Sequence, residues 1–520
     1  MGMFQTIKVE DDRKTNKEAD ILESLSRLFK QLNEESLHYC HWKSNCRLNN
    51  ALQGDTDLDI LVDRSHSIRF REILLQHDIK PLLAAPGWRY PGLEDYLGFD
   101  DISGEFFHLH VHYQLVLGEQ FVKNYHLPIE DQVLKSTTMQ SGVRIPLPEV
   151  ELVILCMRAL LKYRDRDLIK DLFSIRSPGV PLHIRQELEY LFNQTTMEAV
   201  DEILRKEFNL LPRKIILDFL STISLDQRNG REFYSLRKKL RISLARFQRY
   251  SRLKASSIYF IEMWRRRKTF YPKKNKGKMN LANGGISLAL VGIDGAGKST
   301  FHQYVIAWLS WKLNVLGFYL GSKQPSRTSD ILYIIFRMFR RAHRSISQKF
   351  GGNSAFTGWL DDLKRNFLIA HYVSIGDDRY KRYQGGTYTR NNGAVVIFDR
   401  YPLEQISTKS EYRMLDGPQS PLIGGKPGGK LGRILASKEI EYYTKMQLPD
   451  HLIILDVDPK VSILRKPDHN QEILSAKNRA IQDLLNRGDF QNGTEIHKID
   501  ANQPMNDVLR QLKSVIWEIL

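Results

Sequence analysis

A glycine-rich segment near the middle of the chain has the residue types that hold phosphate groups. It reads GIDGAGKST over residues 292–300 and matches the pattern GxxxxGK[ST]. The glycines let the backbone turn tightly, so that successive N–H groups point at phosphate oxygens, and a following helix adds its positive N-terminal end. The Lys298 ammonium can reach the β- and γ-phosphates, and the Ser299 hydroxyl can ligate Mg²⁺. We therefore expect ATP and Mg²⁺ to be bound by Gly292, Gly295, Ala296, Gly297, Lys298, Ser299 and Thr300.

Two downstream segments supply further groups for phosphate chemistry. The run VVIFDRYP places Asp399 and Arg400 at the end of an apolar strand, the edge at which open α/β sheets bind ligands. Asp399 can hold Mg²⁺ directly or through water, and Arg400 can clamp a phosphate group. The segment LPDHLIILDVDPKVSILRKPD predicts a strand and then a helix ending near Arg465, a basic residue suited to a mobile lid. The structural alternatives are a strand-end ion pair and a solvated basic face.

In this order, GIDGAGKST, the DRY triplet and LPDHLIILDVDP resemble the thymidylate-kinase-like branch of P-loop kinases. The resemblance implies that Asp294 approaches the acceptor, Asp399 assists Mg²⁺, Arg400 grips a phosphate and Arg465 serves as a lid arginine. True thymidylate kinases usually continue the DRY motif with a Ser and then an Ala-Tyr-Gln run that helps to hold the thymine nucleotide. Here the sequence reads DRYPLEQISTKS, so we expect an acceptor other than thymidine monophosphate.

Two carboxylates near the N-terminus form a second constellation. In HWKSNCRLNNALQGDTDLDILVDR, Asp57 and Asp59 are separated by one residue on a predicted strand and therefore project from the same face. Carboxylates so placed can share Mg²⁺ ions that organise a triphosphate for nucleotidyl transfer. With Lys43 and Ser44 thirteen residues before Asp57, the segment resembles a divergent nucleotidyltransferase family that is often associated with polysaccharides. A two-carboxylate turn on a surface strand is the structural alternative.

The strand expected beside this pair reads EFFHLHVHYQL and presents His108, His110 and His112 on one face. Nucleotidyltransferases of this kind carry a third carboxylate there. Either a histidine replaces that acid, or the third metal ligand is missing. Three histidines at this spacing can also bind a transition metal, although a structural or acceptor-contacting role is commoner.

The periodicity around these motifs predicts an α/β protein of several domains. Residues 18–150 are expected to form an α+β nucleotidyltransferase-like domain, and 151–225 a helical extension. Residues 226–283 read as a basic helix and linker, and 284–520 as a kinase domain with a parallel sheet, because apolar strands alternate there with helices. A 520-residue chain that is 42% hydrophobic and 26% charged can bury substantial cores.

Nothing in the sequence indicates secretion or a membrane span. No apolar run reaches the roughly 18 residues that a span needs, and the first 17 residues are polar. Three cysteines are too few for a disulfide framework. We expect a cytoplasmic protein, with peripheral membrane contact as a further option.

Positive charge is concentrated in one belt. The net charge is +17, and residues 228–278 alone hold 18 Lys/Arg and two acids. Such a belt with interleaved aromatic residues can lie on an anionic membrane, follow a nucleic-acid backbone (the less favoured partner), or pack as an interdomain helix.

These observations together favour an ATP-dependent phosphotransferase that acts on a small-molecule acceptor: a sugar, a glycolipid or a nucleotide. The N-terminal resemblance implies a related activity or a recognition role, with surface polysaccharide biosynthesis as the expected context. The alternatives are a nucleoside monophosphate kinase such as thymidylate kinase, and a non-catalytic switch controlled by nucleotide and docked on a membrane or nucleic acid.

Overall fold

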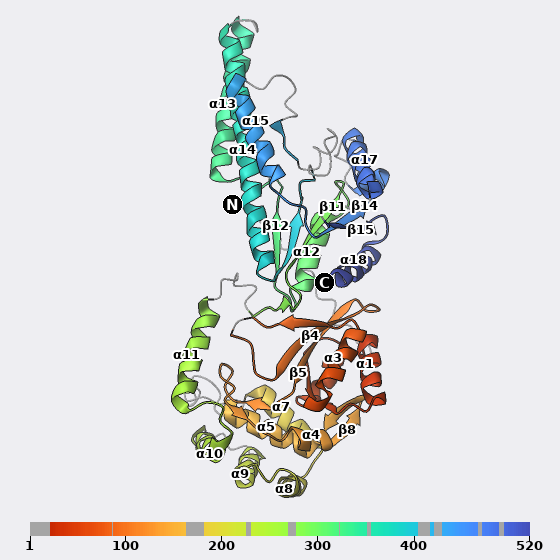
Figure 1. Ribbon diagram of the computed structural model, residues 1–520, viewed down its shortest axis with the longest axis vertical. Coiled ribbons are helices and arrows are strands. Elements are labelled where there is room, and N and C mark those ends of the chain that lie inside the picture. The colour runs from red at the N-terminus through yellow and green to blue at the C-terminus, as the bar shows by residue number, and fades with distance from the viewer. Residues whose placement is uncertain are drawn as a thin grey trace. The chain divides into compact units, whose positions relative to one another are not determined.

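The chain divides into two compact units, Met1–Phe270 and Tyr271–Leu520, each described by itself. The computed structural model describes residues 21–85, 87–162, 181–224, 230–268, 277–321, 323–350, 355–403, 417–420, 429–465, 471–487 and 493–520 (Figure 1). Helices and strands alternate in both units, which confirms the predicted α/β class.

The first unit is built around a mixed sheet whose strands follow the order β1-β2-β5-β4-β3. Its β-rich part consists of α1 Glu23–Glu34, β1 Tyr39–His41, α2 Leu48–Leu52, β2 Leu58–Val62, α3 Ser67–Gln76, β3 Lys80–Leu83, β4 Leu93–Asp100, β5 Glu105–His112, β6 Val116–Leu117, β7 Tyr125–His126, α4 Glu130–Lys135, β8 Thr137–Gln140 and β9 Val143–Pro146. Strands β2 and β5 are parallel, whereas β4 runs antiparallel to β5. This order brings the predicted carboxylate strand and the histidine strand side by side.

A helical layer completes the first unit. It contains α5 Pro148–Lys162, α7 Leu182–Phe192, α8 Met197–Lys206, α9 Arg213–Ser224, α10 Gly230–Ser243 and α11 Arg252–Lys268. Helix α5 is apolar on nearly all sides and lies at the centre of one hydrophobic core, with α7, α8, α9 and α10 packed around it. Helices α10 and α11, which carry much of the basic belt, thus belong to this unit.

The second unit contains a five-stranded parallel sheet in the order β12-β13-β11-β14-β15. Its elements are β10 Asn280–Leu281, β11 Ile286–Gly292, α12 Lys298–Leu309, β12 Val315–Tyr319, α13 Arg327–Phe350, α14 Ala355–Asn391, β13 Val395–Asp399, α15 Gly429–Thr444, β14 His451–Asp456, α16 Pro459–Arg465, α17 Gln471–Arg487, β15 Glu495–Asp500 and α18 Met505–Ile519. The central strands are almost continuously apolar because helices cover both faces of the sheet.

Two long helices distinguish this unit from a minimal α/β sheet. Helices α13 and α14 lie between β12 and β13 in sequence, run side by side, and are joined by α15 along α14 (Figure 1). None of the described helices combines the length and apolar character that a membrane crossing requires.

Candidate active sites

The glycine-rich segment forms the loop between β11 and α12, as its pattern predicts. Gly295 and Gly297 adopt φ angles of 91° and 89°, in the left-handed region that favours glycine. A Cβ atom on Gly295 would also lie 2.6 Å from Ser462 Oγ and 2.9 Å from the Ser462 carbonyl oxygen. Glycine is therefore needed here both for the turn and for the close approach of α16.

The predicted phosphate-binding side chains lie at the start of α12. The Lys298 Nζ atom donates hydrogen bonds to the carbonyl oxygens of Gly292 (2.7 Å) and Ile293 (2.8 Å), which folds the side chain back over its own loop. Ser299 and Thr300 are exposed in the first helical turn. The first backbone N–H groups of a helix lack intrahelical acceptors, so this end of α12 suits an anion.

Asp399 and Arg400 end the neighbouring strand. Strand β13 pairs with β11, with Asp399 opposite Leu290, so Asp399 lies at the carboxyl edge of the sheet where the loop begins. Asp399 is 6% exposed, and its Oδ1 atom has no hydrogen-bond partner among the described residues. A buried carboxylate oxygen normally has a partner, and Mg²⁺ or its water would supply one. Arg400 has φ 56°, an uncommon conformation for a non-glycine residue that often marks functional sites.

Asp294 connects the loop to the C-terminal helices. Its Oδ2 atom forms a 2.6 Å ion pair with Lys477 Nζ on α17, and its carbonyl oxygen accepts a hydrogen bond from the Ser462 hydroxyl on α16. Burial raises the pKa of Asp294, but the bond and charge of Lys477, together with the charges of Lys298 and Arg400, bring it below its usual value. Asp294, Lys298 and Arg400 are therefore close enough to interact electrostatically.

Arg465 is not connected to that group by any described contact. It is exposed on the last turn of α16, the helix that contacts the loop through Ser462. The adjoining residues 466–470 of the predicted lid lie outside the described residues, as do residues 404–416, which follow the DRY triplet.

An arginine that the sequence motifs did not indicate lies beside Arg400. Arg382 on α14 donates to the carbonyl oxygens of Asp378 (3.0 Å) and Gly321 (3.4 Å). Arg400 Cδ lies 2.7 Å from the position that a Cβ on Gly321 would take, so both arginines flank this glycine at the end of β12. The position of Arg382 near Arg400 depends on the packing of α14 against the sheet, so no sequence motif indicates it.

A cavity of about 550 Å³ lies among the helices of the second unit. Its lining includes Tyr333, His371, Arg379, Glu439 and Tyr443 from α13, α14 and α15. Arg379, 3% exposed and one turn before Arg382, donates to the Tyr443 hydroxyl at 2.5 Å. Aromatic faces with a few fixed polar groups are typical of small-molecule sites.

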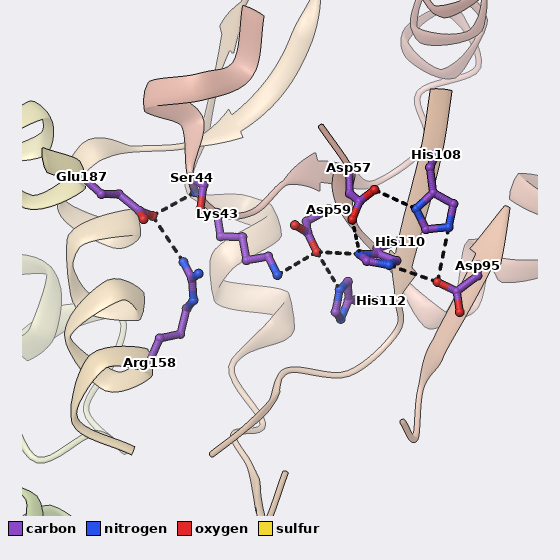
Figure 2. Close-up of polar contacts among 10 residues, drawn as sticks. All are labelled: Lys43, Ser44, Asp57, Asp59, Asp95, His108, His110, His112, Arg158 and Glu187. Carbon is purple, nitrogen blue, oxygen red and sulfur yellow. Dashed lines mark hydrogen bonds and ion pairs between the residues drawn. The ribbon is translucent and has the colours of Figure 1, made fainter. Parts of the chain in front are cut away.

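In the first unit, Asp57 and Asp59 face the histidine strand as predicted (Figure 2). Asp57 contacts His108 Nδ1 at 3.0 Å and His110 Nδ1 at 3.8 Å. Asp59 Oδ1 lies 3.5 Å from His110 Nδ1 and 3.3 Å from His112 Nε2. Each of the three histidines thus contacts at least one of the two carboxylates, and His110 contacts both.

A third carboxylate is present, but on a different strand from the one expected. Asp95 on β4 is opposite His110 in the sheet, and His110 is in turn opposite Asp59. Asp95 Oδ1 lies 3.2 Å from His110 Nε2 and 3.6 Å from His108 Nε2. The imidazole of His110 therefore stands between the carboxylates, as Figure 2 shows. Predicting Asp95 would have required the order of the strands.

The protein's own cations neutralise this acidic group. Lys43 Nζ forms a 2.7 Å ion pair with Asp59 Oδ1. Burial raises the pKa of Asp59, but the Lys43 charge and hydrogen bonds from His110 and His112 hold it well below its usual range. Burial alone would lower the pKa of His110, but hydrogen bonds to Asp59 and Asp95 raise it to about 9, whereas burial lowers that of His112 to about 4.

More positive charge lies next to Lys43. Burial, together with the charges of Lys43, Arg158 and Lys162, lowers the pKa of Lys123 to about 7. Glu187 accepts from the Ser44 backbone N–H at 3.1 Å and lies 3.3 Å from Arg158 Nη1 (Figure 2). The acidic group of the site thus lies next to a group of basic side chains.

Two groups among the described residues have donor atoms close enough to share a metal ion: Asp57, His108 and His110; and His451, Glu495 and His497 in the second unit. The first group mixes nitrogen and oxygen donors, whereas Mg²⁺ prefers oxygen alone. Because Lys43 and His110 already neutralise Asp57 and Asp59, this site fits Mg²⁺ poorly. The carboxylate of Asp399 beside the glycine-rich loop fits it better.

Comparison with known proteins gives a broad functional class. No model of a known protein family matches the chain. Two curated relatives are each called "Uncharacterized ATP-binding protein YghR", one from Escherichia coli strain K12 and one from Escherichia coli O6:H1 strain CFT073. Each is 26% identical over 239 residues, which cover 44% of this chain and 86% of the relative. The chain is thus similar to proteins described as ATP-binding.

Proposed function

We propose that the second unit binds Mg²⁺–ATP and transfers its terminal phosphoryl group to an acceptor. The observation that carries this proposal is the buried Asp399 Oδ1 atom, which lies beside a glycine-rich loop and has no hydrogen-bond partner among the described residues. The similarity to ATP-binding proteins supports the choice of nucleotide. Phosphoryl transfer needs mainly positioning and charge neutralisation, which a loop, a carboxylate and basic side chains supply.

Each side chain has a distinct task in this proposal. Lys298 exchanges its hydrogen bonds with the loop carbonyls for phosphate oxygens, and Ser299 and Asp399 hold Mg²⁺, which neutralises charge on the phosphates when bound. Arg400 and Arg382 stabilise the charge of the phosphoryl group in transit or of a phosphate on the acceptor. Asp294 orients the loop through Lys477.

We infer that the acceptor occupies the cavity among α13, α14 and α15. The aromatic rings of Tyr333 and Tyr443 suit a ring-shaped acceptor, and Arg379 and Glu439 can hydrogen-bond to polar groups on it. A sugar, a glycolipid headgroup or a nucleotide has this character. A nucleoside monophosphate kinase remains the alternative within the same chemistry.

A screen for ADP release over sugars, glycolipids and nucleotides tests the proposal. The wild type should turn over at least one acceptor, and Asp399→Asn should lower the rate by about 10²- to 10³-fold while raising the Mg²⁺ requirement. Asp507→Asn, on the exposed start of α18, is the matched control and should not change the rate. Equal turnover by Asp399→Asn and the wild type would remove the basis of the assignment.

For the first unit, we propose recognition of a related substrate rather than metal-dependent nucleotidyl transfer. The observation that favours this function is the 2.7 Å ion pair between Lys43 and Asp59, because it puts a protein cation where a divalent ion would bind. The test is pyrophosphate release from nucleoside triphosphates by the wild type and by Asp57→Asn/Asp59→Asn. We expect equal background release from both; release by the wild type alone would restore the nucleotidyltransferase reading.

A further inference from the structure

A second cavity, of about 560 Å³, lies within the first unit, and none of Asp57, Asp59 and the three histidines lines it. Its lining comes from residues between 119 and 125 and from helices α10 and α11 of the basic belt. Its volume is in the range of sites that hold a nucleotide or a phosphorylated sugar. The belt therefore contributes to a concave site as well as to the outer surface.

The lining of this cavity carries an excess of positive charge. Arg237, Lys238, Arg241 and Arg252 face it, and Glu119 is the acidic residue among the residues that line it. Glu119 Oε1 lies 2.9 Å from Arg241 Nη2 and 3.7 Å from Arg237 Nη2, so one carboxylate serves two guanidinium groups. Lys238 and Arg252 have no acidic partner among the described residues.

Arg237 makes this excess difficult to explain as a solvated surface. Its side chain is 2% exposed, so water does not screen its charge as it would on an open helix face. Its guanidinium group also lies 5.6 Å from the centre of the Tyr234 ring. A guanidinium group in the wall of a cavity, where solvent screens its charge little, is well placed to bind an anion.

Two other arginines of the belt, Arg266 and Arg249, bind backbone carbonyl groups of the segment 87–123. Arg266 donates to the Gly87 carbonyl oxygen at 2.8 Å and lies 3.8 Å from the centre of the Trp88 ring. Arg249 donates to the Lys123 carbonyl oxygen at 3.1 Å. These contacts attach α11 and the segment before it to the unit, and neither arginine lines the cavity.

The cavity also has aromatic walls. Tyr125, Tyr234, Tyr259 and Phe260 contribute to its lining, and the Tyr125 hydroxyl is held by Gln248 Nε2 at 3.3 Å. Ring faces can stack on a sugar or a base, and tyrosine hydroxyls can hydrogen-bond to it. Charge and ring faces together suit a ligand with a phosphorylated end and a ring.

We propose that this cavity binds a phosphorylated small molecule through two or more negative charges, such as a pyrophosphate or sugar-phosphate group. The arginines bind the phosphate oxygens, and the tyrosines contact the remainder of the ligand. The inference is independent of the proposed phosphotransfer, which uses residues of the other unit.

Hydrogen exchange of the full chain with inorganic pyrophosphate as the probe tests this site. We expect slower amide exchange in α10 and α11, and this local readout distinguishes the cavity from the phosphate loop and from the Lys43 site. For the variant Lys238→Gln/Arg252→Gln, the pyrophosphate concentration that gives half-maximal protection should rise at least tenfold. Both residues are exposed at the cavity rim, so the fold should persist, as a thermal unfolding curve would verify.

The matched control is Lys239→Gln/Arg267→Gln, which removes the same charge from exposed positions of the same two helices outside the cavity lining. It should bind pyrophosphate like the wild type, and equal weakening of both double variants would overturn the proposal in favour of non-specific attraction. Vesicles of anionic phospholipid form a second arm. Protection by vesicles alone would assign the phosphate to a lipid headgroup in the same cavity, and protection by neither probe would refute the site.

Discussion

The two candidate sites treat their carboxylates differently. In the second unit, Asp399 is buried beside the glycine-rich loop, and its Oδ1 atom has no hydrogen-bond partner among the described residues. In the first unit, Asp59 is bound by Lys43 and approached by two histidines. One site retains capacity for a cation from solution, whereas the other has already neutralised its acids. Similar residue types therefore have different partners in the two sites, and we expect these partners to decide whether each carboxylate can bind a cation.

The largest effect that would test this comparison is expected at Lys298. Lys298→Ala should lower ATP turnover about 10³-fold, because it removes a positive charge that acts on the transferred phosphoryl group. Lys498→Ala, which removes an exposed lysine paired with Asp456 in the same unit, should retain full activity. ADP release measures both. Retained turnover in Lys298→Ala would contradict the role of the loop.

A second change would break the neutralised site. Lys43→Met should lower the free energy of unfolding by about 2 to 3 kcal/mol, because it leaves the mostly buried Asp59 with His110 and His112 but without its closest cation. Lys30→Met removes an exposed helical pair with Glu34 and should change stability by less than about 0.5 kcal/mol. Urea unfolding with and without Mg²⁺ measures both variants. If Mg²⁺ restores Lys43→Met, the carboxylates can take a metal once the lysine is gone.

The pH dependence of the free energy of unfolding would extend the comparison to Glu151, a buried carboxylate near the first site. Burial raises the pKa of Glu151 to about 7, although hydrogen bonds from Asn45 oppose the shift. The folded state therefore binds a proton that the unfolded state releases near pH 4.5, and the stability this group contributes is lost as the pH rises through about 7.

Glu151→Gln should consequently gain roughly 2 to 3 kcal/mol relative to the wild type between pH 4 and pH 8. Urea unfolding at both pH values measures this gain. Parallel pH profiles for the two proteins would show that Glu151 is not protonated in the folded state.

The smallest expected effect concerns the backbone of the phosphate loop. Gly295→Ala should weaken ATP binding about tenfold, because its Cβ would meet Ser462 as well as strain the left-handed turn. Gly284 also has a positive φ angle, 109°, but no atom lies within 4 Å of an added Cβ, so Gly284→Ala introduces backbone strain without a steric clash. Titration with a fluorescent nucleotide compares the two variants, and equal affinities would show that the contact with Ser462 does not matter for binding.

Local patterns could be predicted from the sequence and distant contacts could not. The position of the glycine-rich loop between a strand and a helix, and that of Asp399 at the end of a strand, follow from short motifs and could be predicted from the sequence. Asp95, Arg382 and Lys477 reach their sites through strand order and helix packing, which no local spacing encodes. The ion pair between Lys43 and Asp59 also depends on the fold, so the sequence predicted metal ligands but not the lysine that competes for them.

The contacts of Asp294 have a mechanical consequence. The side chain of this loop residue is tied to α17 and its backbone to α16. If the loop shifts when a nucleotide binds, α16 and α17 should move with it. Nucleotide binding would then change the position of Arg465, at the end of α16, even before that residue contacts the nucleotide.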